Sequence, residues 1–185
     1  PERPQICNNP AVPTDVIGQV ASASVADIDL ALQTATAWTA TPLERCETLK
    51  RAANLFEKND GELFALLTRE AGKTLPDTVS ELREAVDFLR FYAKEAEKTP
   101  ENKARGTISC ISPWNFPLAI FTGQIAAALA AGNAVLAKPA NQTPLIAYFA
   151  TCLLHQAGVP RSALQLLPGD GTVGAALTGS ARVDG

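Results

Sequence analysis

Apolar and polar positions follow a helical period through the first part of the chain. In four stretches the apolar side chains recur three or four positions apart, which places them on one face of a helix. The stretches run from Val25 to about Thr39, from Pro42 through Phe56, from Asp60 to Gly72, and from Pro76 through Tyr92. Thr41 followed by Pro42 is a strong start signal, because proline is favoured in the first turn. We therefore expect a layer of four helices.

The second part of the chain changes period. Short apolar runs alternate with helical stretches that begin at proline or end at glycine. In order they are a strand at Thr107–Ile111, a helix at Leu118–Ala131, a strand at Ala134–Ala137, a helix from Thr143 to Gly158, a strand at Leu164–Leu167 and a helix after Gly171. Short connections of this kind predict a parallel sheet with right-handed crossovers. The expected fold class is α/β, a partial parallel sheet with flanking helices, preceded by a helical N-terminal layer.

Charge divides the chain at the same place. Residues 1–105 hold 13 Lys and Arg with 17 Asp and Glu, whereas residues 106–185 hold 3 and 2. We therefore expect residues 1–105 to form a solvated helical layer and residues 106–185 a mostly buried α/β unit. The net charge of −3 and the lack of a basic run argue against a nucleic-acid surface. No apolar run reaches the length of about 18 residues that predicts a membrane span.

The cysteines, the single histidine and the lack of methionine bear on metal binding, the redox compartment and the completeness of the chain. The four cysteines form no C-x-x-C pair, and His155 is the single histidine, so no metal site is predicted. The cysteines are Cys7, Cys46, Cys110 and Cys152. Together with the lack of a secretory signal, they are expected to be reduced structural thiols in the cytoplasm. The chain lacks methionine and opens with Pro-Glu-Arg-Pro, so we expect a fragment of a longer protein.

Two glycine-containing motifs resemble phosphate-binding loops. Gly169-Asp-Gly171-Thr-Val-Gly174 fits the pattern G-x-G-x-x-G between a predicted strand and a predicted helix. Such glycines can bring backbone N–H groups close to a nucleotide, and the alternative is a tight strand-to-helix turn. The second motif, at residues 71–74, lacks the earlier glycine of a phosphate loop and ends a helix, so we reject it. Arg69 and Lys73 are instead expected to be cations at a helix end.

Two polar residues follow the first two predicted strands. In Ser112-Pro-Trp-Asn-Phe-Pro117 two prolines fix the backbone around Asn115 at the carboxyl end of a strand. A rigidly held amide there can donate to an oxygen that becomes negative during a reaction. The alternative is a turn whose aromatic side chains only fill core. Lys138 ends the next strand with almost no other charge nearby, so it either binds a sugar hydroxyl or phosphate or is a solvated loop cation.

Taken in order, these stretches resemble the N-terminal half of the aldehyde dehydrogenase superfamily. The matching stretches are Glu70–Lys73, Pro113–Pro117, Ala127–Asn133, Lys138–Ala140, Gln142–Pro144 and Pro168–Gly171. Residues 111–124 are most similar to the L-glutamate-γ-semialdehyde (pyrroline-5-carboxylate) dehydrogenase module of bacterial proline utilization A. Many relatives with other substrates carry a lysine where this chain has Gln124. Residues 84–90 support the same subgroup.

The resemblance implies a truncated Rossmann-like NAD-binding domain and a set of site residues. Lys138 would hold the adenosine ribose, and Gly171 and Gly174 would lie by the adenine. Asn115 would be the side-chain half of an oxyanion hole. In the family a cysteine thiolate attacks the aldehyde, a hydride passes to NAD, and a glutamate activates water for thioester hydrolysis. The residues that would line the cofactor cleft are Ile111, Ser112, Pro113 and Trp114.

Three departures from the family pattern qualify these roles. The segments that carry the nucleophilic cysteine and the general-base glutamate are missing, so this fragment is expected to be inactive by itself. Asn141 stands where relatives commonly have a glutamate bound to the ribose hydroxyls, and an amide would not repel the 2′-phosphate of NADP. The step from Gly171 to Gly174 is one residue shorter than the usual glycine spacing, which weakens those two assignments.

The expected parent enzyme oxidises L-glutamate γ-semialdehyde to glutamate with NAD, in proline catabolism. It is expected to be a homo-oligomer, and FAD would be needed only if a proline dehydrogenase module precedes this segment. Two alternatives stay open. One is an enzyme for another semialdehyde or an aliphatic aldehyde, and the other is a non-catalytic nucleotide-binding segment.

Overall fold

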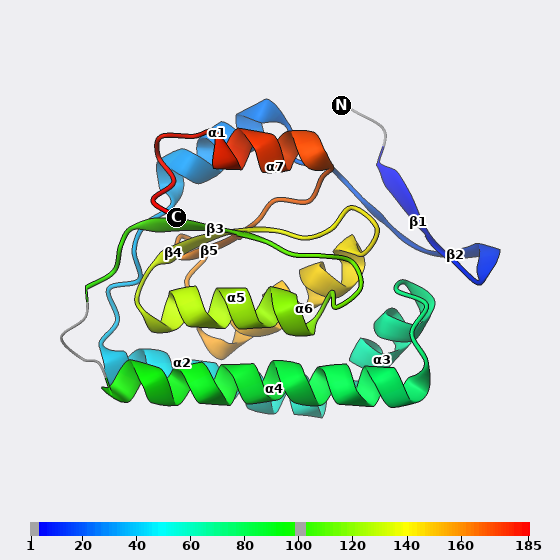
Figure 1. The fold of residues 1–185 in the computed structure, drawn as a ribbon, viewed down its shortest axis with the longest axis horizontal. Helices are drawn as coiled ribbons and strands as arrows, with labels where there is room; N and C mark the ends of the chain where they lie inside the picture. Colours follow the sequence, from blue (N-terminus) through cyan, green and yellow to red (C-terminus); the bar gives the residue numbers. More distant parts are fainter. Residues whose placement is uncertain (1–3, 99–102) are drawn as a thin grey trace.

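The computed structural model describes residues 4–98 and 103–185 (Figure 1). A two-stranded antiparallel hairpin comes first, helices follow, and a three-stranded parallel sheet completes the fold. The strands are β1 (Gln5–Asn9), β2 (Val12–Val20), β3 (Thr107–Ile111), β4 (Ala134–Lys138) and β5 (Leu164–Leu166). The helices are α1 (Val25–Thr34), α2 (Pro42–Lys58), α3 (Asp60–Arg69), α4 (Leu75–Lys98), α5 (Ala119–Ala130), α6 (Pro144–Ala157) and α7 (Gly171–Thr178).

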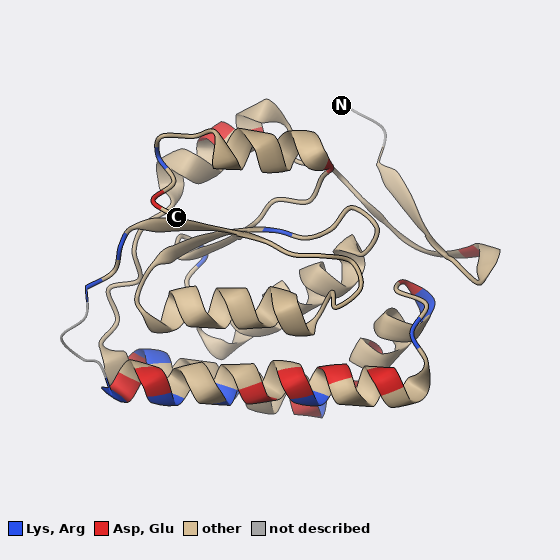
Figure 2. Ribbon diagram, viewed as in Figure 1, with Lys and Arg blue, Asp and Glu red and all other residues tan. Residues whose placement is uncertain are grey.

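The parallel sheet lies between two helical layers. Figure 1 shows α1 and α7 on one face of the sheet and α5 and α6 on the other, with α2 and α4 beyond them. The strand order is β3-β4-β5, which confirms the predicted parallel α/β sheet. Figure 2 shows the acidic and basic residues gathered mainly on α2 and α4, with few on the sheet. The division into units 1–105 and 106–185 stays a prediction. One apolar core contains residues of both ranges.

Two apolar clusters hold these layers together. The larger cluster joins α2, α4, α5 and α6 to one face of the sheet, and Phe56, Leu89 and Phe121 are among its fully buried members. The smaller cluster joins α1 and α7 to the opposite face, where Leu136 of β4 is fully buried. Because β4 is covered on both faces, all five of its residues are buried, as in a central parallel strand. Within the described part of the chain, no helix has the length and apolar character needed to cross a bilayer.

Local signals begin α1 and α2 where the sequence predicts. Ser24 and Asp27 form a reciprocal capping box at the start of α1, and Thr41 and Glu44 form another at α2. The predicted ends agree less well. α1 ends at Thr34 rather than near Thr39, and α3 ends before Gly72. The hairpin β1–β2 was not predicted, because its outer positions expose valine and isoleucine instead of showing a buried apolar face.

Helices α5 and α6 lack a capping side chain at their own N-termini. Buried glutamates from the helical layer cap them instead. Glu70 accepts hydrogen bonds from the N–H groups of Leu145 (2.7 Å) and Ile146 (2.9 Å) at the start of α6. Glu81 of α4 accepts from the first N–H groups of α5. The N-terminus of a helix has N–H donors without partners and a partial positive charge. Each carboxylate therefore accepts hydrogen bonds from these donors and also interacts favourably with the charge.

Burial makes the Glu70 cap sensitive to pH. Loss of solvation raises the pKa of Glu70 from 4.5 to about 7, although its two backbone donors lower it. The folded state therefore binds this proton more tightly than the unfolded state, and stability falls as pH rises from about 4.5 to about 7. At about 1.4 kcal/mol per pKa unit, the loss is on the order of 3 kcal/mol.

Urea unfolding of the chain and of Glu70→Gln at pH 5 and pH 8 measures this effect. The wild-type chain should lose on the order of 3 kcal/mol more than the variant between the two pH values. Other titrating groups are common to both proteins, so they cancel in the difference. Equal losses would show that Glu70 is not the titrating group.

Candidate functional site

The carboxyl ends of the parallel strands form one rim of the sheet. Ile111 at the end of β3 lies opposite Lys138 at the end of β4, and Ala137 lies opposite Leu166 of β5. Past the ladder, the N–H of Ser112 donates to the carbonyl of Lys138 at 3.2 Å. The segments that follow these strands therefore leave the sheet at the same edge. This is the edge at which open α/β sheets bind ligands.

The strand connections reverse direction at β3. Backbone groups of Thr107 and Ser109 point away from β4, because alternate residues of a strand bond to opposite sides. There the N–H of Asp184 donates to the carbonyl of Thr107, and the N–H of Ser109 donates to the carbonyl of Gly185, both at 2.8 Å. After α7 the chain has thus crossed to the other side of β3. In open α/β sheets, ligands bind outside the strand ends at such a switch point.

The loop after β3 presents Asn115 to solvent at this rim. Trp114 is 55% exposed and Phe116 is 41% exposed, so the interpretation that the aromatic side chains of the turn only fill core is wrong for this chain. Within the described residues, the Asn115 side chain has no hydrogen-bond partner, and its amide is free to donate. Ser112 is 6% exposed, and its hydroxyl is buried without a partner. A buried unsatisfied hydroxyl is unusual and indicates a place for a ligand or water.

Lys138 is buried at the rim rather than solvated. Its side chain is 6% exposed, and the ammonium donates one hydrogen bond to the carbonyl of Pro139 at 3.0 Å. Burial lowers the pKa of Lys138, and the negative charge of Asp170 partly opposes this. An ammonium has three donors, so this group keeps capacity for a hydroxyl or phosphate. The interpretation of Lys138 as a solvated loop cation is therefore wrong.

The glycines of Gly169–Gly174 differ in what they do. Gly169 has φ +152°, and a Cβ placed there would lie 2.4 Å from Cγ2 of Val173, so the turn itself requires this glycine. Gly171 has open space around it. A Cβ on Gly174 would lie 3.6 Å from Lys138 and 3.8 Å from Ile111, so α7 faces these two residues closely. Within this motif, Gly169 forms the tight turn, and Gly174 lies close to Lys138 and Ile111.

Asn141 lies beyond Lys138 in the loop that leads to α6. Its backbone carbonyl accepts a hydrogen bond from the side-chain amide of Gln5 at 2.8 Å, which ties this loop to β1. Its neighbours are fixed by the Glu70 cap at the start of α6. The structure thus joins Ile111, Lys138 and Gly174 in direct proximity and places Asn115 and Asn141 on adjoining loops of the same rim.

Residues excluded from the site lie elsewhere. His155 is in the last turn of α6, where its Nδ1 lies 2.9 Å from the carbonyl of Val159. Burial raises the pKa of Cys110 to about 12 and that of Cys7 to about 11, so both remain thiols. Arg69 lies in the last turn of α3, as predicted, and also pairs with Asp15. Lys73 lies beyond the end of that helix and pairs with Glu81.

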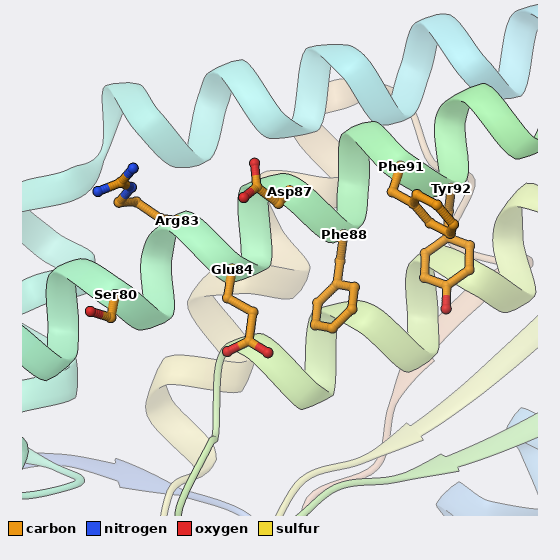
Figure 3. A pocket seen from close by; sticks show the side chains of 7 residues that line it. All are labelled: Ser80, Arg83, Glu84, Asp87, Phe88, Phe91 and Tyr92. Atoms are coloured by element: carbon orange, nitrogen blue, oxygen red, sulfur yellow. The ribbon is translucent and has the colours of Figure 1, made fainter.

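A groove of about 620 Å³ on the outer side of α4 was not found from the sequence. Figure 3 shows Glu84, Phe88 and Tyr92 pointing from α4 toward α5, whereas Arg83 and Asp87 turn toward α2. The remaining lining residues are Ser80 and Phe91. Periodicity places Tyr92 on the apolar face of the helix and the charged positions on the solvated face, so it predicts no groove between them. The exposed Phe91, in edge contact with Tyr92, was the one signal on the chain, and a single exposed aromatic does not identify a site.

The groove meets the rim through α5. A Cβ on Gly123 would come within 3.0 Å of the Phe88 ring, so Phe88 packs directly on the backbone of α5. The same helix begins just after the loop that carries Asn115. The Gln124 side chain of α5 donates to the carbonyl of Ile111 at 3.3 Å, which ties α5 to the end of β3. The loop with Asn115 therefore connects the rim of the sheet to the helix that Phe88 contacts.

The fold and this rim define a class: an α/β protein of the Rossmann type whose binding site is built at the carboxyl ends of the strands. The sequence model of the family described as "Aldehyde dehydrogenase family" matches residues 2–185 of the chain. The chain belongs to the aldehyde dehydrogenase family.

Individual relatives agree with this assignment. The chain is 55% identical to the bifunctional protein PutA of Klebsiella aerogenes over 96% of its own length and 14% of that protein. It is 39% identical to a 1-pyrroline-5-carboxylate dehydrogenase of Anoxybacillus flavithermus, over 88% of this chain and 36% of the relative. A crystal structure of 1-pyrroline-5-carboxylate dehydrogenase from Thermus with bound NAD superposes with a TM-score of 0.92. That comparison has 31% identity and covers 99% of this chain and 40% of the other.

Alanine substitutions at Gly169 and Gly171 test which of these glycines the turn requires. Gly169→Ala forces a methyl group into strained backbone and against Val173, and should lower the unfolding free energy by about 1–3 kcal/mol. Gly171→Ala meets nothing within 4 Å and should change it by less than about 1 kcal/mol. Urea unfolding of both variants tests this difference, and equal destabilisation would contradict it.

Proposed function

We propose that the protein containing this segment is a NAD-dependent aldehyde dehydrogenase that oxidises L-glutamate γ-semialdehyde to glutamate. The observation that carries the proposal is the rim at the switch point, where Asn115 is exposed beside the buried Lys138 and the partnerless hydroxyl of Ser112. Family membership and the similarity to PutA and to 1-pyrroline-5-carboxylate dehydrogenases support it.

The residues present fit a dinucleotide. Lys138 has unused donors for ribose hydroxyls, and the open space around Gly171 leaves room beside the first turn of α7, while Gly174 lies close to Lys138 itself. Residues 111–114 would line the cleft in which the nicotinamide accepts a hydride. Asn141 offers a neutral amide, which would not repel a 2′-phosphate, so we propose NAD as the cofactor with NADP tolerated.

Asn115 would act on the substrate oxygen. Its amide lies on a loop fixed by two prolines and has no competing partner, so it can donate as charge develops on the aldehyde oxygen. Burial raises the pKa of Cys7, Cys46 and Cys110, which disfavours the thiolate at each. No cysteine of this chain, Cys152 included, lies in the family's nucleophile motif, so we propose that the thiolate and the general base come from outside these residues and that the chain by itself does not turn over.

The groove on α4 favours an amino-acid semialdehyde over a plain aliphatic aldehyde. It combines aromatic surface from Phe88 and Tyr92 with the carboxylate of Glu84, which points to the same side. An aldehyde that carries an ammonium matches this combination, whereas an aliphatic chain leaves the charge of Glu84 unused. Its volume of about 620 Å³ lies within the usual range of small-molecule sites.

The oxyanion role of Asn115 is tested in the full-length protein. Asn115→Ala should lower kcat by about 10²–10³-fold, because one fixed donor to the developing oxyanion is lost. The KM for NAD should change little. NADH formation measured by absorbance gives both constants, and NADP is assayed in parallel. The isolated chain of 185 residues should form no NADH. An unchanged kcat in the variant would remove Asn115 from the reaction.

Substrate choice is tested at Glu84. In the full-length protein, Glu84→Gln should lower kcat/KM for L-glutamate γ-semialdehyde by at least about tenfold, since about 1.4 kcal/mol of ion pairing is lost. Activity on butanal should be unchanged, because butanal has no ammonium group. A parallel loss on both aldehydes would show that the groove does not select the substrate. A preference for butanal in the unmodified enzyme would support the aliphatic alternative.

A further inference from the structure

The loop that carries Asn115 is held by a buried ion pair from the helical layer. Glu81 is 1% exposed, and one carboxylate oxygen accepts from the N–H groups of Leu118 (2.8 Å) and Ala119 (3.2 Å). The other oxygen lies 2.5 Å from the ammonium of Lys73, whose side chain is 13% exposed. The pair thus fixes the first turn of α5, three residues after Asn115.

Lys73 contacts the same loop at a second point. Its ammonium lies 4.3 Å from the centroid of the Phe116 ring, which is the geometry of a cation–π contact. Phe116 is the residue next to Asn115, and the ring is otherwise partly exposed. The ion pair therefore contacts the loop through a side chain on one side and through backbone N–H groups on the other.

Asn115 itself has no bond that would orient it. Within the described part of the chain, its side chain makes no hydrogen bond. The direction of its amide depends on the backbone, and that backbone is fixed by Pro113 and Pro117 and by the contacts of the Lys73–Glu81 pair. A displacement of about 1 Å at a reacting group can cost about 10²-fold in rate. The buried pair is therefore in a position to control catalysis from outside the site.

We propose that Glu81, paired with Lys73, is a positioning residue that sets the placement of Asn115 for the reaction. The inference rests on the proposed function, because it assumes that Asn115 acts on the substrate. Glu81 touches neither substrate nor cofactor, and it acts through the first turn of α5 and through Phe116. Its loss should therefore lower kcat and leave cofactor binding nearly intact.

Glu70 provides a contrast within the same molecule. It is also a buried glutamate from the helical layer and also caps a helix of the sheet layer, with 5% exposure. The helix is α6, however, and the preceding loop carries Lys138 and Asn141. Glu70→Gln should therefore raise the KM for NAD more than it lowers kcat. A role in general stability alone predicts the same kinetic effect from both glutamates.

The experiment uses the full-length protein with Glu81→Gln, Glu70→Gln and a surface control. Glu57 pairs with Arg90 at 2.6 Å on the solvent side of the helical layer, so Glu57→Gln removes an ion pair that touches no site loop. Glu81→Gln should lower kcat about tenfold or more, with the KM for NAD within about twofold of the unmodified value. Glu57→Gln should leave both constants unchanged.

A double-substitution cycle tests whether Glu81 acts through Asn115. Glu81→Gln added to Asn115→Ala should cause little further loss of kcat, because the group that Glu81 positions is already absent. Losses that multiply would overturn the inference. Equal kcat and KM effects of the two buried glutamates would also overturn it, because they would indicate a loss of stability rather than of positioning.

A crystal structure of the full-length Glu81→Gln variant separates this inference from the proposed function. A displaced loop at residues 113–117 with reduced kcat supports the inference. An unmoved loop with unchanged kcat overturns it, even while Asn115→Ala still inactivates the enzyme. A displaced loop together with full activity in Asn115→Ala overturns both the role of Asn115 and this inference about catalysis.

Discussion

The arrangement of the site depends on carboxylates that cross from one layer to the other. Helices α5 and α6 begin at the rim, and neither has a capping side chain of its own. Glu81 and Glu70 supply the acceptors, so the first turns of both helices are attached to the helical layer. Burial of a carboxylate is unfavourable unless its charge is matched. Helix N–H groups offset part of this cost at both glutamates, and Lys73 adds a counter-charge only at Glu81. The two layers and the two site loops are therefore fixed by the same interactions.

Parallel strand order then places different chemistry at the two ends of one loop. The ladder puts Ile111 beside Lys138, at the strand ends where open α/β sheets bind ligands. Gly174 of α7 lies close to both residues. At the other end of the loop, α5 packs against Phe88 of α4, which borders a groove with charges of both signs. The loop that carries Asn115 thus connects the rim of the sheet to the helix beside the groove.

The same positions explain why the helical layer belongs to the site although most of its charges face solvent. Figure 2 shows the charged residues along α2 and α4, and most of these side chains are exposed. Glu70, Glu81 and Lys73, like the buried Arg45 of α2, differ from these exposed charges because they have partners in the sheet layer or its loops. Amino-acid composition alone does not distinguish these residues from charges on the surface. Their partners give them a structural role that exposed ion pairs lack.

The sequence alone determined the elements whose causes are local. Helical periodicity, Thr41 with Pro42, and the runs before each glycine or proline located the helices and the parallel strands, since each signal acts within a few residues. Motif order located the rim residues. Only the tertiary structure decided the hairpin, the burial of Lys138, the groove on α4 and the long-range caps. Glu81 accepts from a backbone N–H 37 residues away, and Glu70 accepts from one 75 residues away. A pairing across such separations leaves no periodic trace, because it exists only after the layers have packed.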